Sequence, residues 1–221
     1  MNYQEVWDQI FLSKSWGKYP PEALLRFVGR NYIHKGNVKG VKALELGCGP
    51  GSNIWFLSRE GFEAYGVDIS PVAISKANER LKSEGLTAQL VTGSITNLPY
   101  ENDYFDFVID NACVYCLNEA STKIVMKEVH RVLKKGGLFF SITFADDTTR
   151  GEGFTTINDL EFKDAKVGTF ANAGYVRLAS KEKIHEIYGE DFEIKSIEKL
   201  RLSNQDESHT ISHWIVTVQK A

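Results

Sequence analysis

The segment 43–53 (ALELGCGPGSN) constrains the fold most, because it joins an apolar strand to a helix through three glycines spaced two apart. Only glycine lets a backbone turn this sharply and come this close to a ligand. A second apolar run, 62–67, ends at Asp68, the position at which a doubly wound fold holds a ribose with a carboxylate. The pattern therefore predicts an α/β enzyme with a nucleoside-containing cofactor.

The spacing of these glycines decides between two kinds of cofactor. A dinucleotide site is usually written G-x-G-x-x-G, but Ser52 stands where that pattern needs its last glycine. Glu45 precedes the loop, and a carboxylate there suits a ligand with a cationic end better than a pyrophosphate. The segment strongly resembles the first motif of class I S-adenosylmethionine-dependent methyltransferases, and residues 67–70 (VDIS) resemble the second. The motifs span roughly residues 40–144, and the layout of the remainder agrees with the family.

Apolar periodicity and capping residues place helices and strands in alternation along the chain. Ser70 and Pro71 provide an N-cap and a first-turn proline for one helix, and Gly136 is expected to end another. The expected helices are 3–14, 21–32, 51–60, 71–84 and 120–134. The expected strands are 41–46, 62–67, 88–92, 105–110 and 138–144. This βαβ repetition predicts a doubly wound, mostly parallel sheet with helices on both faces.

The carboxyl-terminal part of the chain breaks this alternation. Segments 192–202 and 210–219 both have the composition of strands, yet only residues 203–209 lie between them. A connection this short cannot carry a parallel crossover, so the two strands either pair antiparallel or do not pair. A terminal antiparallel hairpin is also how the seven-stranded methyltransferase sheet ends. We therefore expect a Rossmann-like methyltransferase fold in a single domain, 1–221.

Two segments outside the repeating core are expected to cover the site. Residues 145–179 contain four glycines and four aromatic residues and are long for a connection, which favours a substrate lid formed by this insertion. Residues 1–40 are expected to form an N-terminal helical cap whose segment 16–20 (WGKYP) supplies the opposite wall. Trp16 and Tyr19 are therefore candidates for the substrate side.

The resemblance implies how the cofactor is held at the carboxyl ends of the strands. The glycine loop follows the methionine part, Glu45 holds the ammonium directly or through water, and Asp68 takes both ribose hydroxyls. Ile69 and Ile95 cover the adenine, whereas Ser94 stands where many relatives carry an acidic residue. The full set of expected cofactor-binding residues is Glu45, Gly47, Cys48, Gly49, Gly51, Asn53, Asp68, Ile69, Ser94, Ile95, Asp110 and Asn111.

Residues at the end of the fourth expected strand should face the sulfonium and the acceptor. Asp110 could instead cap the following turn, and Tyr115, a further substrate-side candidate, could be a packing aromatic. The donor carries an electrophilic methyl group, so direct in-line transfer depends mostly on orientation, and a base is needed only when the acceptor keeps its proton. No catalytic residue is assigned.

The cysteines and a small group of aspartates raise the question of a metal. The chain has three cysteines, two of them in a C-x-x-C at 113–116. A redox pair would open a helix after an early strand, and a zinc site would need two more ordered ligands, so structural cysteines are the better interpretation. One metal-dependent subclass of the family binds an acceptor diol through carboxylates after the fourth and fifth strands, near the positions of Asp110, Asn111, Asp146 and Asp147. Its spacing is not reproduced here, and no metal is expected.

Composition narrows the partners. The 221 residues, 43% hydrophobic and 25% charged, fit one soluble globular domain, and a net charge of −3 disfavours nucleic acid as a partner. The chain has no leader pattern and no apolar segment of membrane length, and its odd cysteine count is typical of a reducing cytosol, so a cytoplasmic protein is expected. We expect methyl transfer to a small molecule; the alternatives are a nicotinamide-dependent oxidoreductase and a non-catalytic adenosyl-binding regulatory protein.

Overall fold

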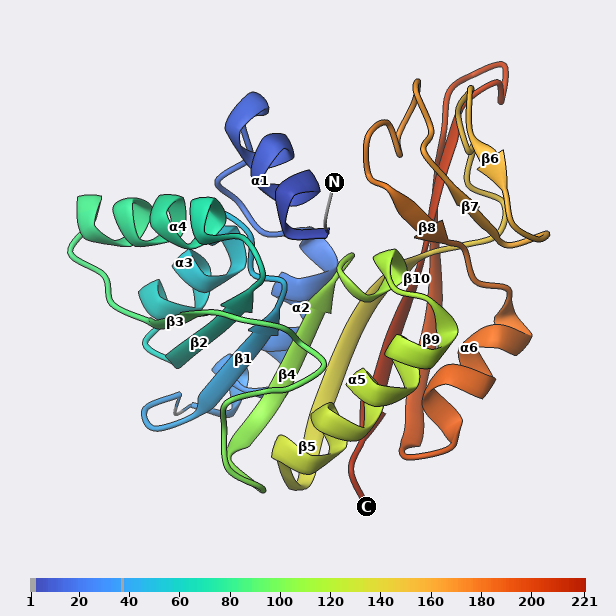
Figure 1. The fold of residues 1–221 in the computed structure, drawn as a ribbon. Helices are drawn as coiled ribbons and strands as arrows, with labels where there is room; N and C mark the ends of the chain where they lie inside the picture. Colours follow the sequence, from blue (N-terminus) through green and yellow to red (C-terminus); the bar gives the residue numbers. More distant parts are fainter. Residues whose placement is uncertain (1–2, 37) are drawn as a thin grey trace.

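A twisted sheet with helices on both faces forms the body of the molecule in the computed structural model, which describes residues 3–36 and 38–221 (Figure 1). Residues 1, 2 and 37, included in the expected cap, lie outside the described part. The helices are α1 (Tyr3–Ser13), α2 (Glu22–Asn31), α3 (Ser52–Arg59), α4 (Pro71–Ser83), α5 (Glu119–Val132) and α6 (Lys181–Gly189), with short 3-10 turns η1 (Ile33–Lys35) and η2 (Val114–Cys116). The strands are β1 (Lys42–Leu46), β2 (Glu63–Asp68), β3 (Gln89–Thr92), β4 (Phe105–Asn111), β5 (Leu133–Phe144), β6 (Thr155–Thr156), β7 (Glu161–Lys163), β8 (Tyr175–Arg177), β9 (Glu193–Ser203) and β10 (Thr210–Gln219).

The order of the strands confirms the expected fold class. Within the described residues, seven strands form one sheet in the order β3-β2-β1-β4-β5-β10-β9. β1 pairs in parallel with β2 and β4, whereas β10 pairs antiparallel with β5 and β9. The direction of winding reverses between β1 and β4, and a ligand of such a sheet binds beyond the carboxyl ends of the strands at this switch point.

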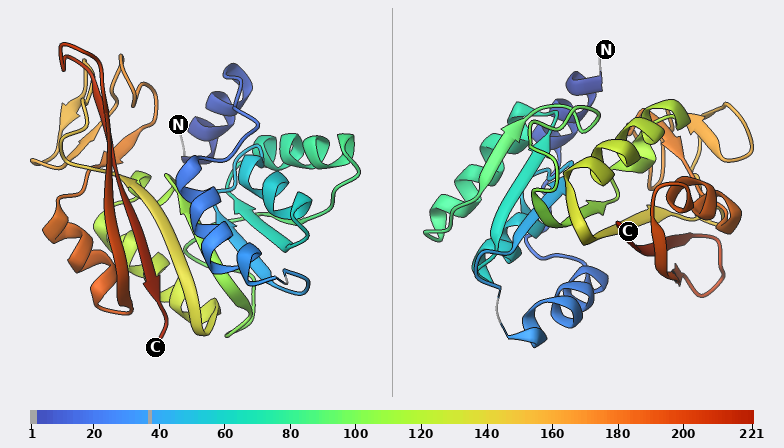
Figure 2. Two further views of the ribbon diagram at one scale, coloured as in Figure 1. Left: turned by 180° about the vertical axis from the view of Figure 1, so that it is seen from behind. Right: turned by 90° about the horizontal axis from the view of Figure 1, so that it is seen from below.

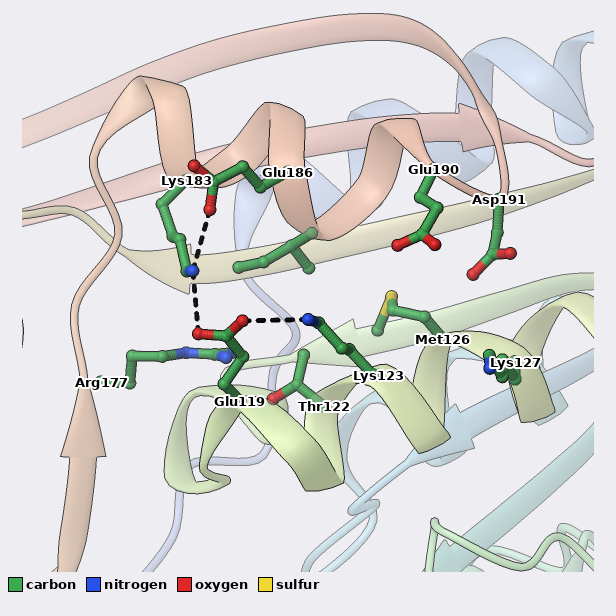
Figure 3. A pocket seen from close by; sticks show the side chains of 11 residues that line it. Glu119, Thr122, Lys123, Met126, Lys127, Arg177, Lys183, Glu186, Glu190 and Asp191 are labelled. Carbon is green, nitrogen blue, oxygen red and sulfur yellow. Dashed lines mark hydrogen bonds and ion pairs between the residues drawn. The ribbon is translucent and has the colours of Figure 1, made fainter.

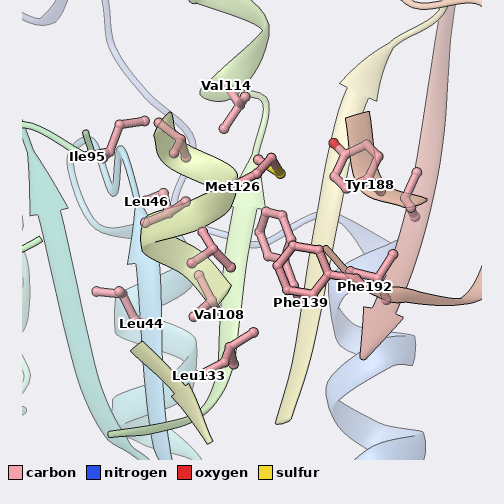
Figure 4. Close-up of a cluster of buried hydrophobic side chains, with 14 of the residues drawn as sticks. Leu44, Leu46, Ile95, Val108, Val114, Met126, Leu133, Phe139, Tyr188 and Phe192 are labelled. Atoms are coloured by element: carbon pink, nitrogen blue, oxygen red, sulfur yellow. The ribbon is translucent and has the colours of Figure 1, made fainter. Parts of the chain in front are cut away.

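Large apolar side chains hold the helices on the two faces of the sheet. On one face, Leu44 of β1 belongs to a buried cluster with Met126 of α5 and Tyr188 of α6 (Figure 4). On the other face, Phe27 of α2 stacks on Phe140 of β5 at a centroid distance of 4.6 Å. Figure 2 shows α2 and the pair α5 and α6 on opposite sides of the sheet. Each fully buried side chain of this size stabilises the fold by about 1.5–3 kcal/mol.

The junction between α5 and β5 differs from the expectation. The expected helix 120–134 ends earlier, at Val132, and β5 begins at the next residue instead of at 138. The expected role of Gly136 as a helix end is therefore wrong. It lies inside β5 with a φ of +76°, where the pairing of β4 and β5 changes register, and a bulge of this kind favours glycine.

The insertion 145–179 folds into structure of its own. Its strands β6, β7 and β8 form a small antiparallel sheet that stands at the same edge of the molecule as α1 (Figure 1). Phe162 and Phe170 are buried against Phe144 at the end of β5. These strands are two or three residues long, so sequence periodicity could not reveal them.

Candidate functional site

A cavity of about 420 Å³ lies at the switch point of the sheet, beyond the carboxyl ends of β1, β2 and β4. The loops after these strands form its floor, and α1 lies across it (Figure 1). The topology therefore brings together residues from Tyr3 to Thr169, which are far apart in the sequence. Its lining includes ten of the twelve expected cofactor-binding residues, namely Glu45, Gly47, Cys48, Gly49, Asn53, Asp68, Ile69, Ser94, Ile95 and Asn111.

The glycine loop adopts a backbone that only glycine accepts easily. Gly47, Gly49 and Gly51 have φ values of +59°, +50° and +78°. A Cβ on Gly47 would lie 2.3 Å from the sulfur of Cys113, so this glycine lets the loop approach the turn that follows β4. Gly51 does not line the cavity, and a Cβ there would lie 2.8 Å from the Cβ of Ala77. Its role in this structure is to bring α3 close to α4.

Glu45 and Asn53 form a buried pair that is incomplete. Asn53 donates a hydrogen bond from Nδ2 to Oε1 of Glu45 at 2.6 Å. The second carboxylate oxygen, Oε2, and the Asn53 Oδ1 are buried and have no hydrogen-bond partner among the residues that the structure describes. Burial raises the pKa of Glu45 well above its usual value, and the hydrogen bond from Asn53 opposes the shift. Two unpartnered acceptors beside a cavity fit a ligand that carries a cationic N–H donor.

Asp68 is the last residue of β2 and lines the same cavity. Its two carboxylate oxygens accept hydrogen bonds from the backbone N–H groups of Gly49 and Ser70, each at 2.8 Å. Burial raises the pKa of Asp68, and these two hydrogen bonds oppose the rise. The carboxylate thus fixes the glycine loop and still has lone pairs that could accept from a ligand. Ser70, as expected, also caps α4, since its Oγ accepts from the N–H of Ala73.

Asp110 is separated from the cavity despite its place at the end of β4. It is fully buried and does not line the cavity. Its Oδ1 accepts from the N–H groups of Cys113 and Val114 at 2.8 and 3.0 Å, and its Oδ2 accepts from Ser141 at 2.7 Å. These contacts correspond to the alternative that Asp110 caps the following turn. Its neighbour Asn111 lines the cavity.

The substrate-side candidates occupy different places. Tyr115 and Trp16 both line the cavity, and Tyr115 packs edge-on against Phe144. Tyr19 does not line it; this side chain is 75% exposed and lies with its ring edge-on to Trp55. From the insertion, Thr169 contributes to the lining.

A row of aromatic side chains on α1 forms the wall that sequence reasoning missed. Tyr3, Trp7 and Phe11 all line the cavity, and the Tyr3 hydroxyl donates to the backbone carbonyl of Cys116 at 2.7 Å. Their spacing of four residues places them on one face of a helix, so the sequence did carry a signal.

The three cysteines are free thiols, and all of them border the cavity. Burial raises the pKa of Cys48, Cys113 and Cys116, which keeps these thiols protonated near neutral pH. In the part of the chain that the structure describes, no group of three or more histidine, cysteine and acidic side chains is placed to hold a metal ion. Asp147 instead pairs with Lys199 of β9 at 3.1 Å.

Comparison with known proteins gives a consistent result. Residues 43–137 match the family model described as a methyltransferase domain. An uncharacterized methyltransferase of Synechocystis sp. is 33% identical over 100 residues, which cover 45% of this chain and 45% of that protein. A phthiotriol/phenolphthiotriol dimycocerosates methyltransferase of Mycobacterium leprae is 34% identical over 103 residues, 46% of this chain and 37% of its own length. The chain thus spans half or less of the length of these relatives.

Solved structures agree on the fold. A SAM-dependent methyltransferase from Methanosarcina mazei superposes with a TM-score of 0.71 at 21% identity and covers 86% of this chain and 97% of its own. A Burkholderia thailandensis N1-methyltransferase was solved with 1,6-didemethyltoxoflavin and S-adenosylhomocysteine. It has a TM-score of 0.67 at 15% identity and covers 99% of this chain and 89% of its own. Among residues 3–36 and 38–221, no helix combines the length and apolarity needed to cross a membrane.

Proposed function

We propose that this chain, whose residues 43–137 match a methyltransferase domain, is a class I S-adenosylmethionine-dependent enzyme that transfers the methyl group of that donor to a small, largely apolar molecule. The observation that carries the proposal is the incomplete buried pair of Glu45 and Asn53 beside the cavity. A cationic N–H group at this point would satisfy both unpartnered oxygens. The amino-acid end of S-adenosylmethionine carries such a group, whereas the nicotinamide dinucleotides carry pyrophosphate.

We assign the other donor contacts from the same geometry. Asp68 has further lone pairs beyond those used by Gly49 and Ser70, and these can accept from the ribose hydroxyls. Ile69 and Ile95 line the cavity and provide apolar surfaces for the adenine. Ser94 offers a hydroxyl in place of a carboxylate, so recognition of the adenine amino group by an acidic side chain is not part of this proposal.

The opposite wall suggests how an acceptor is handled. It presents aromatic rings and neutral thiols, which favour an uncharged or weakly polar molecule. Burial raises the pKa of Tyr3 and Tyr115, so both phenols keep their protons near neutral pH and do not act as anionic bases. The Tyr3 hydroxyl already donates to the carbonyl of Cys116, which leaves Tyr115 as the phenol that can donate to an acceptor. The bound donor supplies the electrophilic methyl group. These side chains would orient the acceptor in line with it and exclude water.

Two similar proteins indicate the range of acceptors. The Burkholderia structure contains 1,6-didemethyltoxoflavin beside S-adenosylhomocysteine, and the Mycobacterium leprae relative is named for phthiotriol and phenolphthiotriol dimycocerosates. We extend only the broad class, a small molecule with substantial apolar surface, to this chain.

The experiment that tests the proposal is isotope transfer. The purified protein is incubated with S-adenosylmethionine carrying a deuterated methyl group and with a metabolite extract, and the products are compared by mass spectrometry with those from the unlabelled donor. We expect pairs of products that differ by the mass of the label, absent from a parallel reaction with Glu45→Gln. Binding of S-adenosylhomocysteine without any labelled product would favour the non-catalytic alternative.

A further inference from the structure

A second cavity of about 420 Å³ lies between α5 and α6, and it shares no lining residue with the first (Figure 3). It is a groove whose side chains come from both helices and from the end of β8. Charged side chains of both signs and the apolar side chains of Met126 and Ile187 line it.

Arg177 is the unusual member of this lining. It ends β8, its residue is only 3% exposed, and its Nη1 is buried with no hydrogen-bond partner among the described residues. A guanidinium stays charged at any pH that a protein tolerates. The side chain reaches into one end of the groove (Figure 3). A buried cation with an unsatisfied donor is costly unless an acceptor completes it.

The carboxylates around Arg177 are engaged with other groups. Glu119 pairs with Lys183 and with Lys123, both at 3.1 Å, and Glu186 pairs with Lys183 at 2.9 Å. These interactions leave the guanidinium facing the groove.

Two further carboxylates, those of Asp110 and Glu161, lie near Arg177 in the fold. The positive charge of Arg177 lowers the pKa of Asp110 against the effect of burial. Both oxygens of Asp110, however, already accept hydrogen bonds from the η2 turn and from Ser141. Glu161 of β7 is the cross-strand partner of Arg177 in register, yet the structure places no ion pair between the two. The missing acceptor is therefore best supplied from the groove itself.

The rest of the groove defines the chemistry of that acceptor. Met126 and Ile187 supply apolar surface, which suits an apolar body attached to the acceptor. At the end of the groove away from Arg177, the carboxylates of Glu190 and Asp191 outnumber the single cation of Lys127, so this end repels a multiply charged phosphate more strongly than a monocarboxylate (Figure 3). A carboxylate matches the fork of a guanidinium. We propose that this groove binds a small monocarboxylate with an apolar body, at a site separate from the methyl-transfer cavity.

Fluorine NMR on the full chain tests this proposal, with 4-fluorobenzoate as the probe. We expect saturable changes in the shift or width of the probe signal. The neutral analogue 4-fluorobenzyl alcohol should bind at least about tenfold more weakly, because it cannot make charge-assisted hydrogen bonds to Arg177. Inorganic phosphate should not displace the probe. Equal binding of the neutral analogue, or displacement by phosphate, would contradict the proposal.

Three variants locate the site. Arg177→Gln should weaken binding of 4-fluorobenzoate at least about tenfold, and Ile187→Trp should block the groove while keeping the guanidinium. Glu161→Gln is the matched control, and it should bind the probe at least as well as the wild type. Each variant is first checked for an unchanged circular dichroism spectrum. Binding that survives both Arg177→Gln and Ile187→Trp, or that appears only in Glu161→Gln, would overturn the assignment.

Discussion

Glu45 lies in an environment that penalises its charge until a cation arrives. Burial raises the pKa of Glu45, so the folded, ligand-free protein holds a proton there at pH values at which the unfolded chain has released it. The free energy of unfolding of the ligand-free protein should therefore fall as pH rises from the ordinary glutamate pKa to the raised value. A bound ammonium reverses the preference, because it favours the ionised carboxylate.

Binding of S-adenosylhomocysteine should consequently release a proton from Glu45. Calorimetry in buffers of different ionisation enthalpy measures this release. The affinity of the protein for S-adenosylhomocysteine should increase with pH through the same range. Methylthioadenosine, which lacks the amino-acid end, should show neither effect. Glu45→Gln should remove the proton release and weaken S-adenosylhomocysteine at least about tenfold, since hydrogen bonds to charged groups contribute roughly 1.5–3 kcal/mol. Wild-type binding without proton release would contradict this role of Glu45.

Asp68→Ala should weaken S-adenosylhomocysteine at least about tenfold, because two hydrogen bonds from the ribose to a carboxylate would be lost. The structure adds a second expectation. Because Asp68 also accepts from the N–H groups of Gly49 and Ser70, the variant should melt at a lower temperature than the wild type. Asp159→Ala, at an exposed position in the insertion, serves as the control for both measurements. Wild-type affinity in Asp68→Ala would show that this carboxylate is not the ribose anchor.

Gly66 illustrates a glycine that is required for packing rather than for backbone freedom. A Cβ there would lie 2.7 Å from the sulfur of Cys48 and 2.9 Å from Leu90, so Gly66→Ala should destabilise the fold by about 1–3 kcal/mol. At Gly93, by contrast, a Cβ would meet its neighbours at 3.8 Å, an ordinary contact. Denaturant unfolding of Gly66→Ala and Gly93→Ala should therefore separate the two. Equal stability of the pair would mean that the loop around Cys48 yields easily.

At the scale of elements, α1 and the insertion differ in how firmly they are held. The insertion buries Phe162 and Phe170, whereas α1 places its aromatic row over the cavity and contacts α4 through polar groups such as Asp8 with Ser70 and Lys76 with the carbonyl of Phe11. We propose that α1 is the more mobile part of the cover over the acceptor.

Hydrogen exchange should therefore slow in residues 3–13 when S-adenosylhomocysteine binds, because the ligand fills the space beneath Trp7 and Phe11. Strand β7, which lies between β6 and β8 and buries Phe162, should be protected with and without ligand. Mass spectrometry of peptides from both states gives the comparison. Unchanged exchange in residues 3–13 would remove α1 from the cover.

Elements with strong local signals were predictable from the sequence. Ser70 and Pro71 marked the start of α4, and the short link 203–209 excluded a parallel crossover, so that any pairing of the last two strands had to be antiparallel. The start of β5 was not predictable, because the chain passes from helix to strand without a break and Gly136 belongs to a bulge fixed by pairing with β4. The length and aromatic content of the insertion favour a cover, but its sheet could not be predicted, because strands this short show no alternation.

For the whole molecule, the sheet topology decides which residues meet. Motif reasoning identified most of the floor of the cavity, since these residues end strands that meet at the switch point. It could not determine that Asp110 turns its carboxylate toward Ser141, or that Tyr19 lies outside the cavity, because both outcomes depend on tertiary packing. Arg177 likewise carried no sequence signal, because its isolation arises only from the packing of α5 and α6 around it.

We propose that the cavity at the switch point binds an adenosyl donor with a cationic amino-acid end. Isothermal titration of the wild-type protein with S-adenosylhomocysteine, and in parallel with NAD, measures this preference. We expect saturable one-to-one binding of S-adenosylhomocysteine and no measurable binding of NAD under the same conditions. Tighter binding of NAD than of S-adenosylhomocysteine would contradict it.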